Sequence, residues 1–168
     1  LMGTFIVEGG RRLSGEIFPQ GAKNEALQVI CATLLTSDSV TIRNIPQIAD
    51  VDKIIGLLEC MGVTITRESA SVITFKAENI NLDYLQTPEF RDQSMSLRGS
   101  IMVVGPLLAR FGKAFIPKPG GDKIGRRRID THFIGFQKLG AILESDDPGL
   151  FYKAEASVLE GSYIHLDE

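Results

Sequence analysis

An internal repeat limits the possible folds of this chain more than any other feature of its sequence. Apolar residues recur at helical spacing or alternate along short runs, and the resulting order of helices and strands occurs twice. The first unit predicts helices over residues 25–36 and 51–61 and strands over residues 40–42, 63–66 and 71–75. The second predicts helices over residues 94–110 and 130–139 and strands over residues 113–117, 141–143, 151–154 and 163–166. This mixture indicates an α/β (α+β) fold.

The second unit contains about five residues more than the first. Aligning the helix that ends at Gly62 with the helix that ends at Gly140 gives an offset of 78 residues, whereas aligning Pro46 with Pro119 gives 73. The extra residues therefore fall between Pro119 and Asp130. This segment is rich in glycine, which costs backbone entropy and adds no side chain for packing. We interpret it as a mobile functional loop, the alternative being a solvated surface loop.

Positive charge is concentrated in the same loop. The whole chain has a net charge of −3, which argues against a general nucleic-acid binder because affinity for the phosphate backbone needs a basic face. Asp122 is the only acidic residue between positions 117 and 129. The cations of this segment are Lys118, Lys123, Arg126, Arg127 and Arg128. Such a local excess predicts a small anionic ligand.

Two further positions are candidates for binding an anion. Lys23 and Asn24 stand where the first long helix should begin, with Asn24 expected as the N-cap, and a helix N-terminus attracts anions. The alternative is a capped helix that carries a surface lysine. Arg98 lies in the first turns of an otherwise apolar helix, so its guanidinium must snorkel, form an ion pair or face a cleft. For Arg98, a cleft with an anionic ligand and a structural ion pair both remain open.

Several classes of protein are excluded. Cys31 and Cys60 lie in apolar runs without metal-ligand spacing, so we expect two buried, reduced thiols and no metal site. No apolar stretch approaches the roughly 20 residues of a membrane span, and no secretory leader is present, so we expect a cytoplasmic protein without a membrane partner. His132 and His165 are expected to make structural bonds. Dinucleotide, Walker and catalytic-triad motifs do not occur.

Five motifs in this order resemble one family, the UDP-N-acetylglucosamine 1-carboxyvinyltransferases, which are the enolpyruvyl transferases of peptidoglycan synthesis. The resemblance covers the whole chain. The motifs are GAKN (21–24), SLRGS (96–100), GPLLARFG (105–112), PGGDKIGRR (119–127) and Asp130 with His132.

The resemblance implies two similar domains, each built from three repeats, that close on substrates between them. The present chain would supply two of the three repeats of an enolpyruvyl transferase-like, inside-out α/β barrel domain. Residues 1–20 would be a strand segment of the second, mostly absent domain, and residues 21–168 an incomplete first domain. We therefore expect this piece to be inactive by itself and prone to self-association, and the complete enzyme to be a monomer.

The implied reaction moves the enolpyruvyl group of phosphoenolpyruvate to the 3′-hydroxyl of UDP-N-acetylglucosamine and releases phosphate, as the first committed step of peptidoglycan synthesis. The resemblance implies neither a metal nor a cofactor. Asp122 would be the general acid, and Lys23, Asn24 and Arg127 would bind phosphoenolpyruvate. The residues implied for UDP-N-acetylglucosamine are Arg98, Arg127, Arg128, Ile129, Asp130 and Thr131.

The chain departs from the commonest family pattern at two places. Asp122 stands where most members have cysteine, so the resemblance implies insensitivity to fosfomycin, an epoxide that alkylates that cysteine. Arg128 stands where proline is common, so which of Arg126, Arg127 and Arg128 contacts ligand is left open. The alternatives are a 5-enolpyruvylshikimate 3-phosphate synthase-like enzyme, which usually has Gly-Ser-Lys-Ser at the lysine turn, and a non-catalytic anion-binding module.

Overall fold

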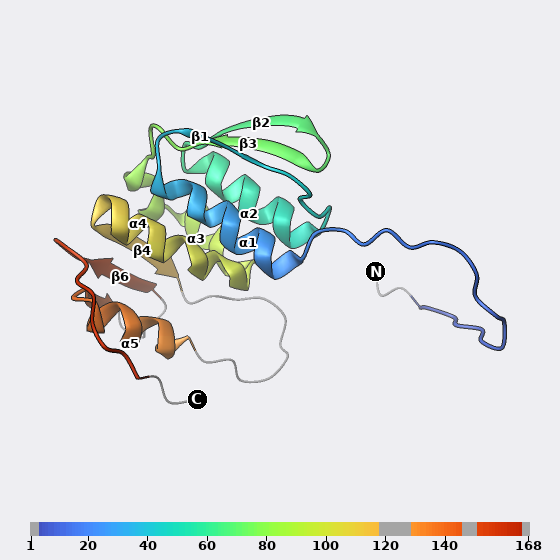
Figure 1. The fold of residues 1–168 in the computed structure, drawn as a ribbon. Helices are drawn as coiled ribbons and strands as arrows, with labels where there is room; N and C mark the ends of the chain where they lie inside the picture. Colours follow the sequence, from blue (N-terminus) through green and yellow to red (C-terminus); the bar gives the residue numbers. More distant parts are fainter. Residues whose placement is uncertain (1–3, 118–128, 146–150, 166–168) are drawn as a thin grey trace.

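The computed structural model describes residues 4–117, 129–145 and 151–165, and two units of the same design form the body of the molecule (Figure 1). The first comprises α1 (Lys23–Ala32), the 3-10 helix η1 (Thr33–Leu35), β1 (Ser39–Ile42), α2 (Ala49–Cys60), β2 (Thr64–Ser69) and β3 (Val72–Lys76). The second comprises α4 (Val104–Phe111), β4 (Lys113–Pro117), α5 (Asp130–Lys138), β5 (Ile142–Ser145) and β6 (Phe151–Glu155). They are joined by η2 (Leu82–Gln86), α3 (Pro88–Met95) and η3 (Arg98–Val103).

Each unit forms an antiparallel three-stranded sheet with its last strand in the middle. The strand orders are β1-β3-β2 and β4-β6-β5, so the predicted repeat is confirmed. The pairing register is also the same, with the row Val40, Phe75 and Ile65 in the first sheet matching the row Ala114, Ala154 and Leu143 in the second.

Glycine ends the second helix of each unit. Gly62 follows α2 with a φ of 102°, and Gly140 follows α5 with a φ of 98°, both in the left-handed region that favours glycine. A Cβ at Gly62 would lie 2.4 Å from the carbonyl oxygen of Asn79. The two glycines are offset by 78 residues, whereas the equivalent strands β1 and β4 are offset by 74 in the matching rows of the two sheets. The second unit thus has four extra residues between β4 and the glycine that follows α5.

One hydrophobic core runs through both units. It includes Ile30 of α1, Leu58 of α2, Phe75 of β3, Phe90 of α3 and Leu107 of α4, each fully buried. Figure 1 shows α1 and α2 side by side beneath the first sheet, with α3 and α4 next to them. Burial of these side chains from helices and sheets of both units supplies the main favourable free energy of the fold.

Arg110 of α4 joins the second unit to the first. Its Nη1 atom donates to the carbonyl oxygens of Leu34, Thr36 and Ala77, at 2.9, 3.0 and 2.7 Å. Leu34 and Thr36 lie at the end of η1, and Ala77 follows β3, so the guanidinium satisfies carbonyl groups that no longer have a partner within their own elements.

The helix predicted over residues 94–110 is interrupted in the structure. Helix α3 ends at Met95, and Leu97 adopts an extended conformation (φ −139°, ψ 119°) before η3 and α4 begin. Serine hydroxyl groups stabilise the break, since Ser96 Oγ donates to the Gln93 carbonyl at 2.8 Å and Ser100 Oγ donates to the Ser94 carbonyl at 2.9 Å. The apolar pattern of the sequence did not reveal that these serine side chains compete with backbone N–H groups for the carbonyl groups of the helix.

Asn24 is not the N-cap of the first helix. Helix α1 already begins at Lys23, and its N-cap, Ala22, makes no side-chain capping bond. The preceding turn is held by tertiary contacts instead. Gly21 packs so closely on Asn44 that a Cβ would lie 2.1 Å from the Asn44 carbonyl oxygen. Sequence reasoning could not detect this backbone contact, which lies directly before the helix.

Two other predictions were wrong. Cys60 is exposed, because it follows the buried Leu58 by two positions and so points away from the core face of α2. Cys31 is buried as expected, and burial raises the pKa of its thiol to about 12. Residues 163–165 form no strand. Tyr163 is 90% exposed, and no strand in the described part of the chain pairs with this alternating segment.

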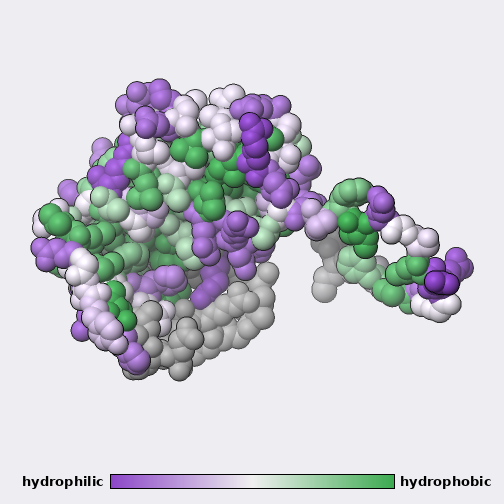
Figure 2. All heavy atoms as spheres, viewed as in Figure 1, coloured by the Kyte–Doolittle hydropathy of each residue, from purple (hydrophilic) through white to green (hydrophobic). Residues whose placement is uncertain are grey.

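The described residues before Gly21 form neither helix nor strand, and they extend away from the body (Figures 1 and 2). Figure 2 shows hydrophobic residues along this arm. Six large apolar residues of the arm are between 84% and 94% exposed: Phe5, Ile6, Val7, Leu13, Ile17 and Phe18. A search of the described residues found no helix with the length and apolar character needed to cross a membrane.

Replacing Arg110 tests the connection between the units. We expect Arg110→Met to lower the free energy of unfolding by about 2–4 kcal/mol, because it leaves three carbonyl groups without their donor. Urea denaturation followed by circular dichroism measures this loss. Arg67→Met, at an exposed position of β2, should change the same quantity by less than about 0.5 kcal/mol. Equal effects of the two substitutions would contradict the connecting role of Arg110.

Candidate functional site

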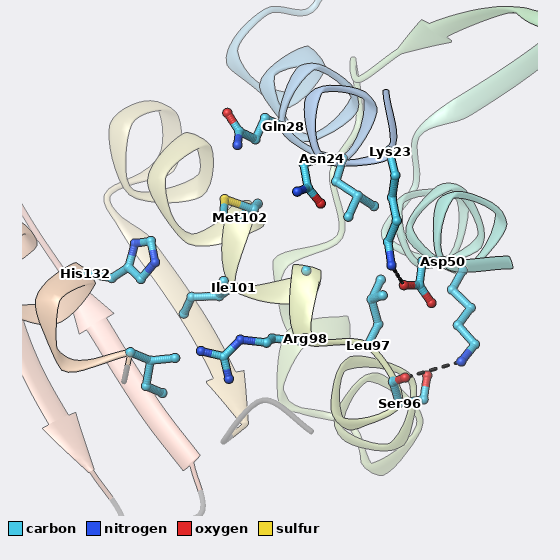
Figure 3. A pocket seen from close by; sticks show the side chains of 14 residues that line it. Lys23, Asn24, Gln28, Asp50, Ser96, Leu97, Arg98, Ile101, Met102 and His132 are labelled. Atoms are coloured by element: carbon cyan, nitrogen blue, oxygen red, sulfur yellow. Dashed lines mark hydrogen bonds and ion pairs between the residues drawn. The ribbon is translucent and has the colours of Figure 1, made fainter. Parts of the chain in front are cut away.

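A cavity of about 540 Å³ lies where four parts of the chain meet (Figure 3). These parts are the first turns of α1 and α2, the junction between α3 and η3, and the start of α5. The polar and charged side chains that line it are Lys23, Asn24, Gln28, Asp50, Lys53, Ser96, Arg98 and His132. Lys23, Asn24, Arg98 and Ile129 come from the predicted set of site residues.

The first turn of α1 contributes Lys23 and Asn24. The ammonium group of Lys23 forms an ion pair with the carboxylate of Asp50, and both side chains remain partly exposed. Figure 3 shows this pair on one side of the cavity, with Asn24 beside Lys23. Asp50 was missed by sequence reasoning. The available signal was an acidic first turn in α2, but only the packing of α1 against α2 brings that turn next to Lys23.

The start of η3 contributes Arg98, and a close approach between η3 and α1 holds it there. A Cβ at Gly99 would lie 3.1 Å from Leu27 Cδ1, so glycine permits this packing. Arg98 extends toward the side of the cavity where His132 lies (Figure 3). Arg98 therefore lines the cavity.

The start of α5 contributes Ile129 and His132. The sequence predicted a structural bond for His132, yet the side chain is exposed to the cavity. Asp130 and Thr131 belong to the first turn of the same helix but are not among the lining residues. Asp122, Arg127 and Arg128 lie outside the described residues.

The charge of the cavity favours an anion. Lys23, Lys53 and Arg98 carry positive charge, and Asp50 is the acidic side chain in its described wall. The N-termini of α1 and α5 add partial positive charge on the same side of the molecule. Lys53, also missed by sequence reasoning, donates to the Ser96 carbonyl at 3.3 Å. Within the described part of the chain, no group of three His, Cys, Asp or Glu side chains could hold a metal.

The fold is that of an enolpyruvyl transferase. The chain superposes on the crystal structure of the enolpyruvyl transferase NikO from Streptomyces tendae with a TM-score of 0.72, covering 90% of this chain and 32% of that one. The two sequences are 20% identical, so the likeness establishes the fold alone. The expected α/β class is confirmed.

Sequence comparison then defines the family. The profile of EPSP synthase (3-phosphoshikimate 1-carboxyvinyltransferase) matches residues 7–167, and the chain belongs to this family. Proteins named UDP-N-acetylglucosamine 1-carboxyvinyltransferase from Bacteroides thetaiotaomicron and Porphyromonas gingivalis are 58% and 53% identical over 99% of the chain. One from Bradyrhizobium diazoefficiens is 42% identical over 98%. The resemblance based on motifs is thus confirmed. The chain spans 36–38% of the length of these relatives.

The contact of Gly99 with α1 can be tested by adding a side chain. We expect Gly99→Val to lower the free energy of unfolding by about 1–3 kcal/mol, because its methyl groups would overlap Leu27. Gly56→Ala is the matched control, since a Cβ there meets no atom within 4 Å. This control, inside α2, should stabilise the protein by about 0.5–1 kcal/mol. Denaturation curves in urea compare the two, and a neutral Gly99→Val would refute the proposed contact.

Proposed function

We propose that this chain forms one wall of the active site of a UDP-N-acetylglucosamine enolpyruvyl transferase. The enzyme would transfer the enolpyruvyl group of phosphoenolpyruvate to the 3′-hydroxyl of UDP-N-acetylglucosamine and release phosphate, at the entry to peptidoglycan synthesis. One observation carries the proposal: Lys23 and Arg98, 75 positions apart in the sequence, line a single cavity with an excess of positive charge. The names of the relatives support the choice of substrates.

This charge suits the chemistry of the reaction. Phosphoenolpyruvate is an anion with a phosphate and a carboxylate, and negative charge develops on its phosphate as that group leaves. Fixed cations and N–H donors stabilise such charge without reorganising during the reaction. We assign Lys23 and Asn24 to phosphoenolpyruvate, together with Arg127. The Asp50 carboxylate would hold the Lys23 ammonium group in place before the ligand arrives.

UDP-N-acetylglucosamine would bind toward the other side of the cavity, where Arg98 and Ile129 lie. The proposal also assigns to this substrate the residues that follow Arg126, from Arg127 to Thr131. Ile129 lines the cavity, so this part of the chain reaches the site at least at one residue. The guanidinium of Arg98 is suited to a diphosphate because it presents several donors in one plane.

The proposed mechanism is addition followed by elimination. Asp122 in its protonated form would donate a proton to the methylene carbon of phosphoenolpyruvate, and the sugar hydroxyl would add to the neighbouring carbon. The hydroxyl loses its proton as its oxygen forms the new bond. Departure of phosphate, together with loss of one proton from the new methyl group, then restores the double bond. A carboxylic acid can perform the proton transfer. It offers no thiolate for an epoxide to alkylate, which is the basis of the expected insensitivity to fosfomycin.

The exposed arm supports a proposal about domain organisation. Six large apolar side chains before Gly21 have no packing partner in the described part of the chain, and exposing them to water is unfavourable. We propose that residues 1–20 complete a second domain and that residues 21–168 belong to the first. Isolated, the chain would be inactive and self-associate through this arm, whereas the complete enzyme would be a cytoplasmic monomer that binds neither nucleic acid nor membrane.

The proposed function is tested by the acceptor requirement for phosphate release. We expect the complete enzyme that contains this chain to release phosphate from phosphoenolpyruvate when UDP-N-acetylglucosamine is present, and not without it. Shikimate 3-phosphate is the matched alternative acceptor. Release with shikimate 3-phosphate alone would favour the 5-enolpyruvylshikimate 3-phosphate synthase alternative, and release with neither acceptor would favour a binding module.

The role of Asp122 is tested by Asp122→Asn. This amide cannot donate a proton as a carboxylic acid does, so we expect turnover to fall by about 10² or more. Affinity for UDP-N-acetylglucosamine, measured by calorimetry, should stay nearly unchanged. Asp38→Asn, at an exposed position before β1, is the control and should turn over normally. A near-normal rate for Asp122→Asn would remove Asp122 from the acid role.

A further inference from the structure

The junction between α3 and η3 determines the position of the Arg98 backbone. Helix α3 ends at Met95, Ser96 keeps helical dihedral angles, and Leu97 turns into an extended conformation one residue before Arg98. A shift of this junction would move the Arg98 side chain within the cavity. Two carbonyl groups at this junction accept hydrogen bonds from serine hydroxyl groups. Gln93 accepts from Ser96, and Ser94 accepts from Ser100.

The carbonyl of Ser96 is held from outside the junction. Lys53 Nζ, on α2, donates to this oxygen at 3.3 Å, the contact whose dashed line ends at Ser96 in Figure 3. Carbonyl groups at the C-terminal end of a helix carry partial negative charge, so an ammonium group is a favourable partner. The bond links two elements that are 43 positions apart.

Helix α2 is a rigid support for this bond. Val51 and Ile54, on either side of Lys53, are fully buried in the core. Asp50 lies one turn before Lys53 on the same face of the helix and binds Lys23. Two neighbouring side chains of α2 therefore hold the two walls of the cavity. Asp50 binds the Lys23 side chain of α1, and Lys53 binds the backbone that precedes Arg98.

We propose that Lys53 is a positioning residue, which holds the α3–η3 junction through the Ser96 carbonyl and thereby orients Arg98 toward the UDP-sugar. This inference rests on the proposed function and adds a residue to it. Lys53 is exposed, and its bond to the Ser96 carbonyl is 3.3 Å long, so the bond contributes little to stability. Its effect should therefore appear in substrate binding rather than in unfolding.

Steady-state kinetics of the complete enzyme test this role. We expect Lys53→Met to raise the KM for UDP-N-acetylglucosamine about tenfold, the equivalent of one charge-assisted hydrogen bond, with little change in kcat. Lys53→Arg, which keeps a cationic donor that can reach Ser96, should restore most of the affinity. Lys138→Met, at an exposed position near the end of α5, is the control and should leave both constants unchanged.

A double-mutant cycle with Arg98→Met separates positioning from direct contact. If Lys53 acts through Arg98, adding Lys53→Met to Arg98→Met should change the KM by less than about twofold. A full tenfold effect in that background would mean that Lys53 contacts the substrate independently, and it would overturn the proposal. An unchanged KM for Lys53→Met alone would overturn it as well.

A measurement without substrate distinguishes failure of this inference from failure of the proposed function. If the wild-type enzyme neither releases phosphate nor binds UDP-N-acetylglucosamine, the proposed function fails. Hydrogen exchange then decides about Lys53. Lys53→Met should increase exchange at the amide of Leu97, which donates to the Ser94 carbonyl across the junction, and Lys138→Met should not. Unchanged exchange in Lys53→Met would refute the role of Lys53.

Discussion

The guanidinium of Arg110 connects the two units through three hydrogen bonds to backbone carbonyl groups. Its three acceptors lie at the end of η1 and after β3, so a single side chain of α4 satisfies backbone groups from both the helical layer and the sheet of the first unit. Backbone carbonyls left without donors inside a packed interface are unfavourable. The connection therefore helps to determine how α4 sits on η1, and with it the position of η3, which leads directly into α4.

The cavity is a consequence of this arrangement. Two units that share one core bring the starts of α1, α2 and α5 and the start of η3 to one place, where backbone N–H groups are not used within the helices. Cationic side chains at these positions add to the partial charges. A site suited to an anion thus results from packing the starts of several helices together. Within it, the Asp50 carboxylate holds the Lys23 ammonium group through their ion pair.

Errors in prediction arose where tertiary contacts compete with local preference. Asn24 had the right residue type for an N-cap, but α1 begins earlier, at Lys23, directly after the close contact of Gly21 with Asn44. The apolar run from residue 94 to residue 110 suggested one helix, whereas serine hydroxyl groups and the extended Leu97 divide it. Of the site, sequence reasoning found Lys23, Asn24, Arg98 and Ile129. It missed Asp50, Lys53 and His132, whose residue types alone indicate no ligand.

The sequence by itself determined the repeat, the class of the fold, the family motifs and the concentration of positive charge between residues 117 and 129. These properties are encoded in local periodicity, residue order and composition, which need no knowledge of distant contacts. Only the tertiary structure decided that Lys23 pairs with Asp50, that Lys53 reaches the Ser96 carbonyl, and that Arg98 faces the same cavity as Lys23. Such contacts join residues tens of positions apart, and they depend on how the helices of the two units pack.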